Sequence, residues 1–172
     1  MGVGPPGHTG RDQLVELRSG LLACLAPATP GGTGPVAICC AQSPPDHRAA
    51  LESRGATLHL VPCVGNLHSS VVELLIRGGA SGVLVAGCPP RDCVGREGPK
   101  WLNERLFNDR EAELQPRVDR RRLRVATLAP GTLAETLATF DAFALELTTL
   151  APLPAETVDE LSLELICEPV PL

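Results

Sequence analysis

Short apolar runs alternate along the chain with segments of helical periodicity. Four of these runs have the length and composition of buried parallel strands. They span residues 36–40, 58–63, 83–88 and 123–128. The segments that follow them place apolar residues on one helical face, near 45–54, 67–77, 99–114 and 132–147. This alternation predicts an α/β fold, a three-layer domain with a mainly parallel sheet of the Rossmann or flavodoxin type and right-handed crossovers.

The alternating pattern occupies residues 35–148, which we take as the domain. Residues 1–34 are predicted to hold a leader, a helix from Arg11 to Leu25 and a linker rich in proline and glycine. Residues 149–172 are predicted to form a C-terminal arm, because two early prolines break any helix there. Within the arm, Leu161–Glu168 alternates partly between apolar and polar residues, like an edge strand or an arm lying on a partner.

Composition and charge narrow the possible functions. A chain of 172 residues with 44% hydrophobic and 20% charged residues fits one ordinary globular domain. A net charge of −5, with no Tyr, one Trp and three Phe, gives no reason to expect nucleic-acid binding. No apolar stretch approaches the length of about 18 residues that a membrane span needs. The N-terminus also lacks the basic start and apolar core of a signal peptide, so we expect a cytoplasmic protein.

Most of the cysteines stand where the predicted strands end. Cys39 and Cys40 close the first apolar run, Cys63 the second and Cys88 the third, and Cys93 follows in the next loop. The carboxyl ends of parallel strands share one edge of a sheet, where ligands of open α/β folds bind. Four thiols that converge there would form a metal or iron–sulfur site, which suits a reducing compartment better than disulfides.

The adjacent pair Cys39 and Cys40 needs a choice. Successive residues of a strand point to opposite faces of the sheet, so only one of the two can face such a site. The residues alone leave open which one it is. Cys24 and Cys167 lie outside this pattern and are assigned to packing.

Two stretches resemble motifs of a known family. The segment Gly87-Cys88-Pro89-Pro90-Arg91-Asp92-Cys93 resembles the Gly-Cys-x-x-x-Asp-Cys signature of the delta (iron–sulfur) subunit of methyl-viologen-reducing hydrogenases. The similarity covers roughly residues 35–145 and includes Val61-Pro62-Cys63-Val64-Gly65, which is similar to the family's Cys-x-Gly motif. Cys40 matches the first cysteine of the family's Cys-Asn-Trp-Cys element. Its second cysteine is Ser43 here, and the Arg usual after the Cys-x-Gly motif is Asn66.

The resemblance implies a [2Fe–2S] cluster held on an α/β domain by Cys40, Cys63, Cys88 and Cys93. It also implies a non-catalytic electron-transfer subunit of a hydrogenase or heterodisulfide-reductase type of complex. Its expected partners are a flavoprotein and other iron–sulfur subunits. Asp92, between the two loop cysteines, is expected to cap the following turn or contact a partner.

Other interpretations of the same residues stay open. Four thiolates suit zinc equally well, which would make the protein a structural adaptor. Three cysteines with His68 would also suit zinc, and a thiol enzyme would use Cys88 or Cys93 as its nucleophile. The basic run from Arg117 to Arg124 is either a solvated connection or a docking face for an acidic partner or a cofactor phosphate.

Overall fold

The computed structural model describes Val15, residues 34–108 and residues 114–151. The predicted helix from Arg11 to Leu25, apart from Val15, and the alternating segment Leu161–Glu168 lie outside these residues. Cys24 and Cys167 lie outside them as well.

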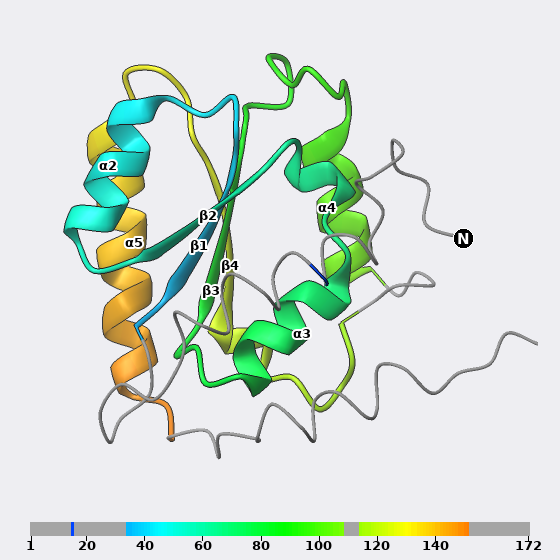
Figure 1. Cartoon of the computed structure of the whole chain (residues 1–172), viewed down its shortest axis with the longest axis vertical. Helices are drawn as coiled ribbons and strands as arrows, with labels where there is room; N and C mark the ends of the chain where they lie inside the picture. Colours follow the sequence, from blue (N-terminus) through cyan, green and yellow to red (C-terminus); the bar gives the residue numbers. More distant parts are fainter. Residues whose placement is uncertain (1–14, 16–33, 109–113, 152–172) are drawn as a thin grey trace, which may run out of the picture.

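Four parallel strands form one sheet in the order β2-β1-β3-β4 (Figure 1). The strands are β1 (Val36–Cys40), β2 (Thr57–Val61), β3 (Val83–Gly87) and β4 (Leu123–Thr127). Every predicted strand is therefore present, and the predicted α/β fold is confirmed. The last three strands end one or two residues earlier than predicted. At β2 the reason is Pro62, which has no amide hydrogen to extend the ladder.

Four helices connect and follow the strands: α2 (Pro45–Ser53), α3 (Ser69–Arg77), α4 (Gly98–Phe107) and α5 (Leu133–Thr148). Two short 3-10 turns, η1 (Val64–Asn66) and η2 (Arg120–Arg122), precede α3 and β4. The prediction that α4 continues to residue 114 is wrong, because the helix ends at Phe107. Leu114 is buried in the core from an irregular segment, and the neighbouring Gln115 N–H donates to Glu73 Oε1 of α3 at 2.8 Å. Leu114 and Gln115 thus pack and hydrogen-bond against other parts of the fold and are not part of a helix.

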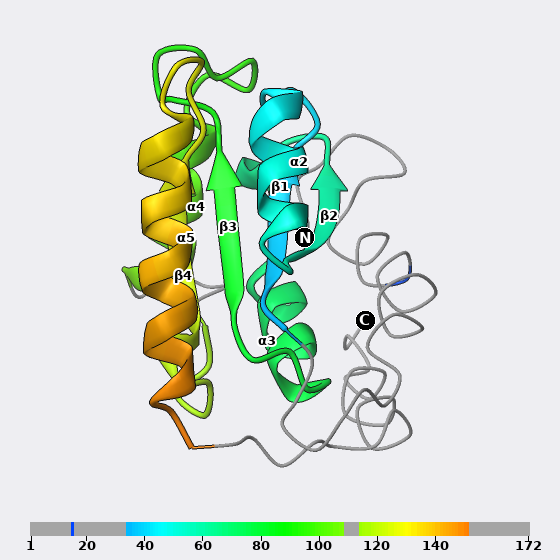
Figure 2. The same cartoon turned by 90° about the vertical axis from the view of Figure 1, so that its left-hand side faces the viewer.

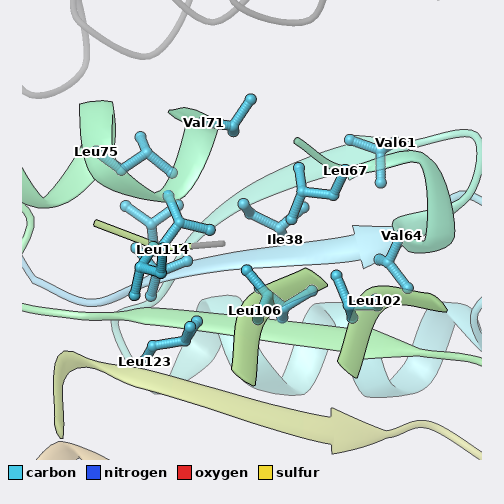
Figure 3. Close-up of a cluster of buried hydrophobic side chains, with 14 of the residues drawn as sticks. Ile38, Val61, Val64, Leu67, Val71, Leu75, Leu102, Leu106, Leu114 and Leu123 are labelled. Carbon is cyan, nitrogen blue, oxygen red and sulfur yellow. The ribbon is translucent and has the colours of Figure 1, made fainter. Parts of the chain in front are cut away.

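The helices cover both faces of the sheet, with α2 and α5 on one face and α3 and α4 on the other (Figure 1). The α2/α5 face packs around Leu51, Phe140 and Phe143. The α3/α4 face packs around Ile38 of β1 and Leu102 of α4, with further apolar side chains around them (Figure 3). Alternate residues of β1 enter the two cores, as the geometry of a strand requires. Among the residues described, no helix has the length and apolar character needed to cross a membrane.

The chain changes direction in the middle of the sheet. From β1 it passes through α2 to β2 at one side, and from β2 it returns through α3 to β3 at the other. The carboxyl ends of β1 and β3 therefore flank the point where the strand order reverses, and the strands point the same way (Figure 2). In open parallel sheets this switch point is where ligands bind.

Two arginines of the basic run, Arg122 and Arg124, make contacts within the fold. Arg122 is buried and donates to the carbonyl of Ser81, at 2.8 Å, and to that of Ala151. Arg124 pairs with Glu146 of α5. The Arg122 contacts join η2 to the residues just before β3 and just after α5, and the Arg124 pair joins β4 to α5. They favour a structural role for these two arginines over a docking role.

Candidate metal centre

The four predicted site cysteines lie at the carboxyl end of the sheet. Cys40 is the last residue of β1 and Cys88 directly follows β3. Both side chains are buried in the core of the α3/α4 face, where Cys93 also packs. Cys63 lies between β2 and η1, and both Cys63 and Cys93 are half-buried. Three strand ends and one loop thus bring the four thiols to one region.

The thiols interact as two pairs. Cys40 contacts Cys88, and the negative charge of a Cys88 thiolate would raise the pKa of Cys40, after the larger effect of burial. Cys63 contacts Cys93 in the same way, and burial is again the main reason why the pKa of Cys63 is raised. The charge of Cys40 raises the pKa of Cys63 more than the charge of Cys93 does, which links the two pairs.

Backbone amides of the η1 turn donate to two of these sulfurs. The N–H of Val64 donates to Cys40 Sγ at 3.3 Å. A hydrogen bond from the Gly65 backbone partly offsets the burial that raises the pKa of Cys63. Such donors stabilise negative charge on sulfur, as they do around bound metals and clusters. A cation that binds here would displace the thiol protons, and these amides would then stabilise the thiolates.

Cys39 lies on the opposite face of the sheet from Cys40. It is completely buried in the core of the α2/α5 face, with Leu60 of β2 and Ala86 of β3 as its register neighbours. Burial, followed by the adjacent Cys40, raises the pKa of Cys39 to about 12. A thiol in this environment behaves as a small apolar side chain.

The remaining candidates have local structural roles. His68 is the N-cap of α3, where its Nδ1 accepts from the Ser70 N–H at 3.3 Å. Burial and then the charge of Arg105 lower the pKa of His68. Asp92 is exposed, and its N–H donates to the carbonyl of Pro89 at 3.0 Å in a turn between the two loop cysteines.

The four thiols are of the ligand type that an iron–sulfur cluster or a zinc ion takes. Within the described part of the chain, no three side chains among His, Cys, Asp and Glu are already arranged to hold a metal ion. The thiols instead form two linked pairs. A [2Fe–2S] cluster takes four thiolates, two on each iron, whereas structural zinc needs four ligands around one point.

Sequence reasoning found the thiols but missed the amide donors. The N–H groups of Val64 and Gly65 are backbone atoms, so no side-chain pattern reveals them. The nearest signal is Gly65 itself, because a glycine two residues after a site cysteine indicates a close backbone approach.

One of the comparisons with known proteins identifies a family for this chain. The family model described as methyl-viologen-reducing hydrogenase, delta subunit, matches residues 47–151, which is more than half of the chain. The matched stretch includes Cys63, Cys88 and Cys93, while Cys40 lies just before it. The search of curated proteins found no match. The chain therefore belongs to the delta-subunit family of methyl-viologen-reducing hydrogenases, which places it in a multi-subunit redox complex of the hydrogenase type.

Proposed function

We propose that this protein is an electron-transfer subunit that holds one [2Fe–2S] cluster through Cys40, Cys63, Cys88 and Cys93. The observation that carries the proposal is the gathering of four thiols, from three strand ends and one loop, at the carboxyl end of the sheet beside its switch point. The cluster would supply one-electron chemistry. The chain would hold it, shield it from water and stabilise its charge with the amides of η1.

The pairing favours the cluster over zinc. The Cys40–Cys88 pair would ligate one iron and the Cys63–Cys93 pair the other. A zinc-stabilised adaptor, the second candidate, would need all four sulfurs to close around a single point.

The exposure of the pairs suggests how electrons would enter and leave. Cys40 and Cys88 are 2% and 8% exposed, while Cys63 and Cys93 are half-buried. Val94, next to Cys93, is 82% exposed. The Cys63–Cys93 side is therefore the side that a partner's redox centre could approach. On family membership we expect that partner to be a flavoprotein or another iron–sulfur subunit of the complex.

The visible spectrum and metal content of anaerobically purified protein test the proposal. We expect a brown protein with sulfur-to-iron charge-transfer bands and about two iron and two acid-labile sulfide per chain. A colourless protein with one zinc would identify the adaptor instead. A colourless, metal-free protein with a reactive thiol would identify a thiol enzyme.

A further inference from the structure

The sulfurs of Cys63 and Cys93 lie against Gly98, the first residue of α4. A Cβ atom added to Gly98 would stand 3.0 Å from Cys63 Sγ and 3.1 Å from Cys93 Sγ. A Cβ added to Gly95 would stand 3.2 Å and 3.8 Å from the same two sulfurs. Optimal contacts between nonbonded heavy atoms are about 3.5–4.0 Å, so a side chain at Gly98 would crowd both sulfurs unless they moved by a few tenths of an ångström.

This requirement for glycine does not come from the backbone conformation. The glycines with positive φ are Gly55, Gly79 and Gly131 among the described residues, and no side chain there would meet another atom within 4 Å. Gly98 differs from these three glycines: its backbone conformation is ordinary, but an added Cβ would be crowded by two sulfurs. Because Gly98 has no side chain, the sulfurs of Cys63 and Cys93 can lie close to the start of α4.

A second glycine fixes the η1 turn to the same point. A Cβ added to Gly65 would stand only 2.3 Å from Gly98 Cα, so the two backbones pack directly against each other. The η1 turn supplies the amide donors to Cys40 and Cys63. Gly98 thus lies between the amide-bearing turn and the Cys63–Cys93 pair.

The end of α4 that meets the sulfurs is its N-terminus. The first N–H groups of a helix have no partner inside it, and together they act as roughly half a positive charge. Residue Glu97 at the N-cap provides no side-chain cap for α4. This helix end therefore acts against the burial that raises the pKa of Cys63.

We propose that Gly98 is a positioning residue, which lets the N-terminus of α4 reach the sulfurs of Cys63 and Cys93. The functional consequence of this inference rests on the proposed function. If a cluster is bound, the positive helix end would favour its more negative, one-electron-reduced form. In that step one electron is added by a donor, and no covalent bond forms or breaks. Gly98 would then raise the reduction potential.

The first test uses metal-free protein and needs no cluster. Phenylarsine oxide joins two neighbouring thiols through arsenic with release of one water, and peptide mass spectrometry locates the bridge. We expect a bridge between Cys63 and Cys93 in the wild type and in Gly82→Ala. In Gly98→Ala we expect it to form about threefold more slowly, because the new Cβ would push the two sulfurs aside by a few tenths of an ångström and a proximity-dependent reaction is sensitive to such shifts.

Gly82→Ala is the matched control. Its new Cβ would meet Leu147 Cδ1 at 2.7 Å in the other core, at the start of β3 and away from the thiols. It should therefore lower stability without slowing the bridge. If Gly98→Ala does not fold, Gly95→Ala replaces it, with a smaller expected effect because its contacts with the sulfurs are longer.

The second test is the midpoint potential of protein that carries the cluster. We expect a lower potential in Gly98→Ala and an unchanged one in Gly82→Ala. An unchanged bridging rate or an unchanged potential in Gly98→Ala overturns the inference, as does the lack of a bridge in the wild type. A protein that never takes a cluster refutes the proposed function instead, and the bridging rate alone then decides the role of Gly98.

Discussion

Cys39 and Cys40 are neighbours in one strand, yet they have opposite environments. Cys39 enters the core of the α2/α5 face, which consists of apolar side chains around Phe140 and Phe143. Cys40 enters the α3/α4 face, where it meets Cys88 and accepts a hydrogen bond from Val64 N. One face of the sheet is thus used for packing, whereas the carboxyl end of the other face also gathers thiols.

The difference shows that a cysteine's chemistry follows from what its face of the sheet contains. Both thiols are buried and both have a raised pKa, so burial alone does not distinguish them. The distinguishing features are the second thiol and the amide donor that Cys40 has. If the two faces are independent, a change on one face should leave the other face intact.

The largest expected effect is the loss of the bound group when a site cysteine is replaced. Cys40→Ala and Cys63→Ala should each abolish iron and sulfide binding, because the cluster loses a thiolate. Cys39→Ala should keep both and lower the free energy of unfolding by about 1–2 kcal/mol, since only a few buried atoms are removed. The test is to measure iron content, sulfide content and visible absorbance in the wild type and these three variants side by side.

The reverse result would contradict the comparison. A protein that loses its cluster in Cys39→Ala and keeps it in Cys40→Ala would place the site on the α2/α5 face. Full retention in Cys63→Ala would show that the second strand end does not contribute.

The next effect concerns the packing of the α2/α5 face. Phe143 is fully buried, with the guanidinium of Arg124 at 5.7 Å from the centre of its ring. Phe143→Ala should lower the free energy of unfolding by about 3–5 kcal/mol in denaturant titrations and leave iron content per folded chain unchanged. Leu102→Ala, on α4, is the matched change on the other face and should reduce both stability and iron content. Loss of iron from folded Phe143→Ala would show that the faces are coupled.

Alkaline pH should destabilise the metal-free protein through Cys39. Its pKa is raised from 9.0 to about 12, mainly by burial, so above pH 9 the unfolded chain loses a proton that the folded chain keeps. Stability from this group is therefore present below pH 9 and is lost as the pH rises toward 12, by about 1.4 kcal/mol per pH unit at most. Urea titrations of wild type and Cys39→Ala across this range should diverge. Parallel curves would show that Cys39 does not keep its proton.

The smallest effect is at a hydrogen bond between α2 and α5. His47 is fully buried, and its Nδ1 lies 3.0 Å from Thr136 Oγ1, which itself donates to the Thr132 carbonyl. Thr136→Val should leave the imidazole N–H without an acceptor and lower the free energy of unfolding by about 1–3 kcal/mol. Thr139→Val, on the exposed side of the same helix, should be nearly neutral. Equal effects in thermal unfolding would mean that the buried hydrogen bond is unimportant.

The pattern of apolar residues was sufficient to predict the strands. Each of the four runs becomes a strand with nearly the predicted start, because a short apolar run fits a sheet buried on both faces. The end of α4 was predicted less well. Leu114 continues the helical spacing, but it is buried from an irregular segment whose next residue hydrogen-bonds to Glu73. A contact between residues distant in the chain has no signal in local periodicity.

Local geometry is enough to predict the alternation of strands and helices, the position of the cysteines at strand ends and the opposite orientation of Cys39 and Cys40. The tertiary structure decided which face each of the two enters, how the four thiols pair, and which backbone groups meet them. Those features depend on the strand order and on the close contact of Gly65 with Gly98. Strand order and backbone contacts are set by the packing of whole layers, which no single segment of the chain encodes.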